Sequence, residues 1–189
     1  MIILASASAR RRELLEKAGI DFIADAADAA ESSDAADPYA TIAYNAFVKA
    51  ASVCGRHPGS WVVGADTAII FRHRIYGKPE NLNAAKRMLA EFSGHGHEVV
   101  TAVAVLRQEA DLHPLVGARF SEISQVYFKA INAADIDAYC GKVEVLDKAG
   151  SYALQEHGDM LIDRFTGSAD NIIGLPVGRL LRALRALPK

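Results

Sequence analysis

Hydrophobic positions along the chain fall into two kinds of block. Short continuous apolar runs rich in β-branched residues are typical of strands buried on both faces. We predict such strands at residues 2–5, 61–71, 99–106 and 123–128, with the last two paired. Segments with apolar residues every three or four positions predict helices instead, at residues 10–19, 39–54, 82–92 and from 178 onward, with another starting near Asn132. Because strands alternate with helices, the fold class is α/β.

The turn after the first predicted strand carries unusual charge. Ser6 and Ser8 precede a helix whose first turn holds Arg10, Arg11 and Arg12. A helix N-terminus attracts anions, so cations there disfavour the helix unless an anion compensates them. Arginine forks match phosphate oxygens two at a time. The segment therefore predicts either a phosphate-binding turn or a solvated basic turn, and the pattern alone leaves both open.

Asp66 stands in the middle of the apolar run 61–71. A carboxylate there is costly unless it meets a cation, hydrogen-bond donors or the open end of a strand. Its two interpretations are a buried aspartate that caps a turn, and a metal ligand or general base at the carboxyl end of a central strand.

Two lysines extend this set. Lys49 lies on an otherwise apolar predicted helix, and Lys78 follows the Asp66 strand in a Gly-Lys-Pro turn. Each alone is typical of a solvated charge. With Asp66 and the arginines they favour a small polyanionic ligand and a divalent metal with oxygen ligands, Mg²⁺ by default.

Composition narrows the class of protein. The 189 residues are 51% hydrophobic and 23% charged, and their net charge is −2, which argues against a nucleic-acid polymer as partner. Cys54 and Cys140 are interpreted as free thiols in a reducing compartment. No apolar run reaches the ~20 residues of a membrane span, and no signal peptide is recognised at the N-terminus. We therefore expect a cytoplasmic protein with no membrane partner.

Several common motifs are missing from the sequence. His95-Gly96-His97 is interpreted as a polar turn rather than a metal-binding pair, because no third ligand lies nearby in the sequence. Neither a dinucleotide-binding glycine motif, nor a P-loop, nor a serine-hydrolase elbow occurs.

Six motifs in the same order resemble the Maf family of nucleoside triphosphate pyrophosphatases, over nearly the whole chain. They lie at residues 4–15, 63–67, 77–79, 93–103, 147–155 and 167–176. The resemblance implies one domain over residues 1–189, of the Maf and inosine-triphosphatase-like fold. In that fold a long curved mixed sheet is flanked by helices, and a substrate cleft lies between two lobes without a separable linker. It also implies a homodimer.

The activity implied is hydrolysis of dTTP, UTP and modified pyrimidine nucleotides to the monophosphate and pyrophosphate, a house-cleaning of the nucleotide pool that depends on Mg²⁺ or Mn²⁺. Asp66 matches the catalytic proton acceptor, and Glu31 with Asp66 matches the metal-binding acids. The residues that match substrate-binding positions are Ser6, Arg10, Arg11, Lys49, Thr67, Lys78 and Gln155; of these, Arg11, Thr67 and Gln155 fit the dTTP/UTP type.

Departures from the family pattern include Ala9 in place of a proline and the basic turn Arg72-His73-Arg74 in place of a more acidic one. The alternative function is a nucleotide-binding regulator of cell division and septum formation with weak or no catalysis. A nucleotidyltransferase is a weaker third possibility, and it would release pyrophosphate only when an acceptor is present.

Overall fold

The computed structural model describes residues 1–32, 36–108 and 115–188. The chain divides into two compact units. Unit 1 comprises Met1–Thr67, Thr101–Glu122 and Gly174–Lys189, and unit 2 comprises Ala68–Val100 and Ile123–Ile173. Each unit is therefore assembled from segments that lie far apart in the sequence.

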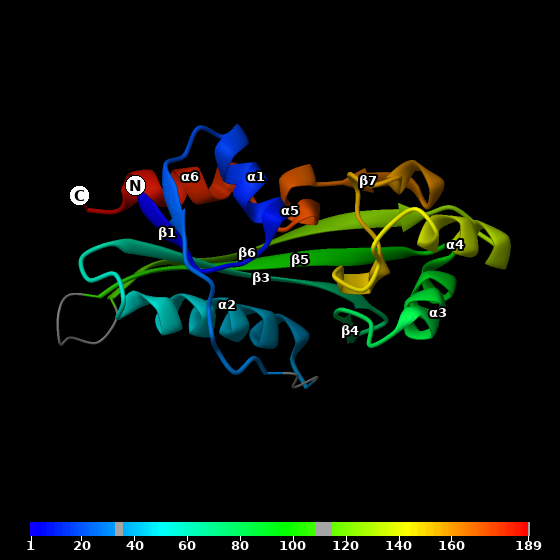
Figure 1. The fold of residues 1–189 in the computed structure, drawn as a ribbon, viewed down its shortest axis with the longest axis horizontal. Coiled ribbons are helices and arrows are strands. Elements are labelled where there is room, and N and C mark those ends of the chain that lie inside the picture. The colour runs from blue at the N-terminus through cyan, green and yellow to red at the C-terminus, as the bar shows by residue number, and fades with distance from the viewer. Residues whose placement is uncertain (33–35, 109–114, 189) are drawn as a thin grey trace. The chain divides into compact units, whose positions relative to one another are not determined.

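The described residues contain one seven-stranded sheet (Figure 1). Its strands are β1 (Ile2–Leu4), β2 (Phe22–Ala24), β3 (Trp61–Phe71), β4 (Arg74–Tyr76), β5 (Gly96–Arg107), β6 (Leu115–Phe128) and β7 (Ile162–Thr166). Six of them follow the order β2-β1-β3-β5-β6-β7, and β4 pairs with β3. β1 is parallel to both β2 and β3, whereas β4 and β7 are antiparallel to β3 and β6. The sheet is mixed and flanked by helices, so the predicted fold class is confirmed.

Four of the helices begin where a side chain caps the first backbone N–H groups. The helix bounds are α1 (Ala9–Lys17), α2 (Pro38–Cys54), α3 (Leu82–Phe92), α4 (Ala133–Cys140), α5 (Ala169–Ile173) and α6 (Val177–Ala186), with short 3-10 turns η1 (Ala149–Ser151) and η2 (Gly158–Met160). Ser8 caps α1, Asp37 caps α2 ahead of a proline, and Asn132 with Asp135 forms a capping box at α4. These caps explain why the predicted helix starts at Ser8 and Asn132 are confirmed.

In unit 1, α2 covers one face of the sheet and α1 and α6 cover the other (Figure 1). The contact between α2 and β3 is unusually close at Gly64. A Cβ atom at this position would lie 2.3 Å from the Ala46 carbonyl oxygen and 2.6 Å from the Ala50 nitrogen. Only glycine permits this approach, and it brings the middle of α2 against the strand that carries Asp66.

The core of unit 2 is aromatic and contains His97, which is 2% exposed. The His97 ring lies 4.6 Å from the ring of Phe92 and 5.1 Å from that of Phe128, and its Nε2 is 2.7 Å from the Tyr152 hydroxyl oxygen. The prediction of a polar turn at residues 95–97 is therefore wrong for His97. β5 begins at Gly96, and strand alternation places His97 on the buried face between Gly96 and Glu98, whereas His95 precedes the strand and is exposed.

Other differences from the sequence prediction concern strand length. β2 was not predicted, because it has three residues and is mostly exposed. β5 and β6 are longer than the predicted strands at residues 99–106 and 123–128, and β6 begins eight residues earlier than predicted.

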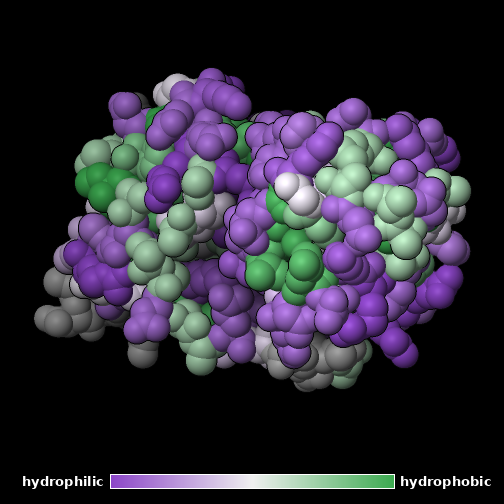
Figure 2. All heavy atoms as spheres, turned by 45° about the vertical axis from the view of Figure 1, so that its right-hand side comes forward, coloured by the Kyte–Doolittle hydropathy of each residue, from purple (hydrophilic) through white to green (hydrophobic). Residues whose placement is uncertain are grey.

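Hydrophilic side chains predominate on the face of the molecule in Figure 2, where hydrophobic groups reach the surface in limited areas. Among the described residues no helix has the length and apolar character needed to cross a membrane.

Candidate active site

Asp66 lies on β3, three residues beyond Val63, the last position at which β1 pairs with this strand. Its side chain is 13% exposed and accepts a hydrogen bond from Lys49 Nζ at 2.7 Å. Lys49 comes from α2, and the same ammonium lies 2.9 Å from Glu31 Oε2, on the segment between β2 and α2. The structure thus places two carboxylates around one lysine, a group that we call the Lys49 cluster.

Asn45 belongs to the same cluster and was missed from the sequence. It lies four residues before Lys49, so the two side chains share one face of α2. Its amide accepts a hydrogen bond from the Ser32 N–H at 2.7 Å and donates one to the Ser32 carbonyl at 3.0 Å. Its Nδ2 also lies 3.4 Å from Asp66 Oδ2. The available signal was a polar residue at helical spacing from Lys49, on a face that also carries Thr41.

Arg11, from the first turn of α1, is the centre of a second network in unit 1. Its guanidinium donates to Ser6 Oγ at 3.1 Å, to Thr67 Oγ1 at 3.1 Å and to the Gly174 carbonyl at 2.9 Å. Burial lowers the pKa of Arg11, while the charge of Asp66 acts in the opposite direction. Three of the predicted site residues therefore meet in one network, and Thr67 adjoins Asp66 on β3.

Gly174 places its carbonyl at Arg11 in a backbone conformation that other residue types rarely adopt. Gly174 has φ +130, and a Cβ at this position would lie 3.5 Å from Thr67 Oγ1. The glycine thus supplies a carbonyl acceptor that few other residue types would place there.

The remaining predicted site residues are less enclosed. Arg10 is half-buried in the first turn of α1. Lys78 and Gln155 belong to unit 2, where both are exposed. In that unit the Gly150 N–H donates to the Gly77 carbonyl at 2.9 Å, which joins the Gly-Lys-Pro turn to the turn at residues 148–151.

Lys148 is a further charged residue that the sequence did not single out as a site residue. Its side chain is 4% exposed, and Nζ lies 2.8 Å from Asp147 Oδ1 and 3.2 Å from Glu156 Oε2. Nζ also donates to the Glu144 carbonyl at 2.6 Å. The lysine therefore closes the loop that runs up to Gln155.

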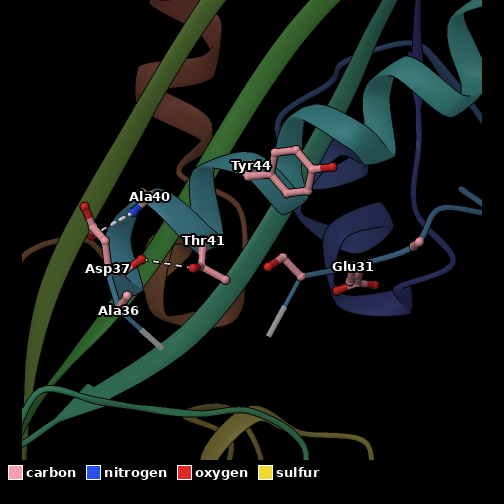
Figure 3. Close-up of a pocket in the computed structure, with 8 residues that line it drawn as sticks. Glu31, Ala36, Asp37, Ala40, Thr41 and Tyr44 are labelled. Carbon is pink, nitrogen blue, oxygen red and sulfur yellow. Dashed lines mark hydrogen bonds between the residues drawn. The ribbon is translucent and has the colours of Figure 1, made fainter. Parts of the chain in front are cut away.

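A surface cavity of about 460 Å³ lies beside Glu31 (Figure 3). Its lining comes from the segment before α2 and from the first turns of that helix, and includes Glu31, Asp37, Thr41 and Tyr44. The Asp37 carboxylate accepts from the Ala40 N–H, and Thr41 donates to the Asp37 carbonyl, both at 3.0 Å. Asp37 and Thr41 are thus engaged in starting the helix, whereas Glu31 reaches back to Lys49.

Across the described residues, no group of three or more His, Cys, Asp and Glu side chains is placed to hold a metal ion. Glu31 and Asp66 form a pair whose oxygens already converge on a cationic nitrogen, Lys49 Nζ. Mg²⁺ at substrate phosphates is commonly held by one or two carboxylates, with phosphate and water oxygens completing the shell. A two-carboxylate site therefore fits this class of cation.

Comparison with known proteins gives consistent results. The Maf family, described as Maf-like protein, matches residues 1–187. A dTTP/UTP pyrophosphatase of Akkermansia muciniphila is 43% identical over 187 residues, covering 98% of this chain and 96% of its own. A protein of the same name from Bacillus anthracis is 38% identical over 185 residues, covering 97% and 94%. A HAM1 protein from Coxiella burnetii has a similar fold, with a TM-score of 0.53 at 17% identity over 97% of this chain and 98% of that one.

Fold and site together define an α/β protein in which an interior strand of a mixed sheet presents a carboxylate to a lysine of the neighbouring helix. The chain belongs to the Maf family, because the family match and the two relatives cover nearly its whole length. The resemblance expected from the six motifs is confirmed.

Proposed function

We propose that this protein is a nucleoside triphosphate pyrophosphatase that hydrolyses dTTP and UTP to the monophosphate and pyrophosphate. The observation that carries the proposal is the Lys49 cluster, in which Asp66 and Glu31 flank one ammonium group. Relatives named dTTP/UTP pyrophosphatase, 38–43% identical over nearly the whole chain, support the substrate class. Modified pyrimidine nucleotides are further expected substrates, in keeping with a house-cleaning role.

Asp66 is the group proposed to act on the attacking water. The carboxylate is held in place by Lys49 and is 13% exposed, so one oxygen can accept a hydrogen bond from water. Water attacks the α-phosphorus, its proton passes to Asp66, and the bond to the bridging oxygen breaks so that pyrophosphate leaves. Positioning a base for such a transfer contributes about 10²- to 10⁴-fold to rate.

A divalent cation, Mg²⁺ or Mn²⁺, is proposed as the cofactor, held by Glu31 and Asp66. When bound, it supplies positive charge to the triphosphate oxygens. Lys49 supplies fixed positive charge in the same place, and the positive charge of Arg10, Arg11 and Lys78 is proposed to bind the triphosphate. Such preorganised charges are worth more in a partly buried site than in water.

Ser6, Thr67 and Gln155 complete the proposed substrate-binding set. Ser6 and Thr67 both accept hydrogen bonds from Arg11, so they hold its guanidinium in one orientation. Gln155 is exposed and its amide both donates and accepts, which suits the edge of a pyrimidine base. The family resemblance also supports a cytoplasmic homodimer, and light scattering on the purified protein checks the dimer.

Substrate and reaction are tested together with a panel of triphosphates. The protein is incubated with dTTP, UTP, dCTP, dATP and dGTP, each with Mg²⁺ or Mn²⁺, and pyrophosphate and monophosphate are quantified. We expect both products in equal amounts, fastest from dTTP or UTP. Nucleotide binding without pyrophosphate release would replace the proposal with a regulatory function.

The role of Asp66 is tested by Asp66→Asn, which keeps the size of the side chain and removes its charge. We expect turnover to fall about 10²- to 10⁴-fold with the fold retained, because the base is lost. Asp21→Asn, which changes an exposed aspartate before β2, is the matched control and should leave turnover unchanged. Near wild-type turnover in Asp66→Asn would remove Asp66 from the mechanism.

A further inference from the structure

The Asn45 side chain, on α2, binds the backbone of the segment that precedes this helix. Oδ1 accepts from the Ser32 N–H at 2.7 Å, and Nδ2 donates to the Ser32 carbonyl at 3.0 Å. Asn45 is 6% exposed, so water competes little for these groups. Both backbone groups of Ser32 are thereby tied to the middle of α2, directly beside Glu31.

An amide suits this contact, because it accepts from the Ser32 N–H at its oxygen and donates to the Ser32 carbonyl from its nitrogen. The donating nitrogen also faces the Asp66 carboxylate, at 3.4 Å, which fixes the amide's orientation. An aspartate in its place would set a second carboxylate against Asp66 and against the Ser32 carbonyl.

The other end of the same segment is held separately. Arg56 donates to both carboxylate oxygens of Asp25, at 2.9 and 2.8 Å, and His57 Nε2 lies 2.8 Å from Asp25 Oδ2. These contacts hold the start of the segment near the end of α2. Six residues further on, Glu31 pairs with Lys49, and the contact between Asn45 and Ser32 holds the backbone beside it.

We propose that Asn45 is a positioning residue that holds the Ser32 backbone and thereby keeps the Glu31 carboxylate at Lys49. Its effect on catalysis rests on the proposed function, because it acts through Glu31. The positioning itself is a property of the fold and does not depend on which substrate is hydrolysed.

Hydrogen exchange tests the positioning directly. In Asn45→Ala, amide exchange in peptides covering residues 26–32 should become about tenfold faster, since a buried hydrogen-bond partner is lost. Thr41→Val is the matched control: Thr41 is also buried, lies one turn earlier on α2 and donates to the Asp37 carbonyl. Exchange at residues 26–32 should not change in this control. Unchanged exchange in Asn45→Ala would overturn the proposal.

Kinetics then separate positioning from a general loss of stability. Loss of a residue that orients a metal or substrate ligand lowers activity by ~10- to 100-fold. We expect that loss for Asn45→Ala in the wild-type background, and almost none when Glu31→Gln is already present, because the two changes remove one function. Losses that multiply fully in the double variant would overturn the proposal.

A second variant covers the case in which Asn45→Ala does not fold. Asn45→Leu keeps the shape of the side chain and loses both the donor and the acceptor without adding a charge beside Asp66, so it should show the same faster exchange and the same dependence on Glu31. If the wild-type protein releases no pyrophosphate from any triphosphate, the proposed function fails, and the exchange experiment still decides whether Asn45 holds the segment.

Discussion

Two lysines, one in each unit, are each paired with two carboxylates, yet their surroundings differ. Lys49 of unit 1 lies between Asp66 and Glu31, which come from β3 and from the segment before α2. Lys148 of unit 2 lies between Asp147 and Glu156, both within eight residues of it in the sequence. The partners of Lys49 thus come from segments that are distant in the sequence, whereas the partners of Lys148 belong to its own loop.

The two lysines also differ in the partner of the third N–H donor of the ammonium group. Lys148 Nζ donates to the Glu144 carbonyl at 2.6 Å, so all three of its donors are directed at its own loop. Lys49 Nζ shows two partners among the residues that the structure describes, both of them carboxylates. We therefore expect the third donor of Lys49 to be available to a ligand, whereas the donors of Lys148 are directed at the chain that carries Gln155.

The largest expected effect is on activity, and it concerns Lys49. Each lysine is replaced by methionine, which keeps the apolar stem and removes the charge. Lys49→Met should lower kcat/KM for dTTP by about 10²- to 10³-fold, the cost of removing one fixed charge or donor from an active site. Lys148→Met should retain most of the activity. Comparable activity losses in the two variants would show that the distinction between the clusters is wrong.

A smaller effect is expected on stability, and it concerns Lys148. Its removal breaks one hydrogen bond to a carbonyl and two ion pairs at a nearly buried position, so the free energy of unfolding should fall by about 1–3 kcal/mol. Urea unfolding monitored by circular dichroism measures the change. Lys17→Met, at the exposed end of α1, is the matched control and should change it by no more than about 0.5 kcal/mol. An equal loss of unfolding free energy in both variants would mean that the contacts of Lys148 do not stabilise its loop.

The same contrast explains how much the sequence could predict. β3 occupies the predicted range, residues 61–71, and helices with strong caps start where expected, because these signals are local. Lys49 and Asp66 were each singled out because they conflict with apolar surroundings, but the contact between them was not predicted. The predicted roles of the site residues stay predictions until the variants are measured.

What could not be predicted depends on contacts between distant segments. Asn45 bonds the Ser32 backbone, and no sequence pattern reveals which carbonyl a buried amide will meet. The three residues of β2 form a strand only because they pair with β1. His97 looked like part of a polar turn, and only the start of β5 at Gly96 turns it into the core.

The most specific prediction concerns this histidine. Burial lowers the pKa of His97 to about 3, whereas in the unfolded chain it is near its ordinary value of about 6.5. Between these values the unfolded state binds more protons, so the stability that neutral His97 contributes is complete above about pH 6.5 and is lost as the pH falls toward 3. The slope approaches about 1.4 kcal/mol per pH unit at most.

The test compares the wild type with the double variant His97→Phe, Tyr152→Phe, which keeps the aromatic packing and removes both ends of the hydrogen bond. Urea unfolding at pH 7, 6 and 5 should show a decline in the wild type that is reduced in the variant. This range avoids Asp25, whose pKa is lowered to about 2 by its hydrogen bonds to Arg56 and His57, so that its contribution is lost only below about pH 4. Parallel declines in the two proteins would mean that acid sensitivity arises outside the core of unit 2.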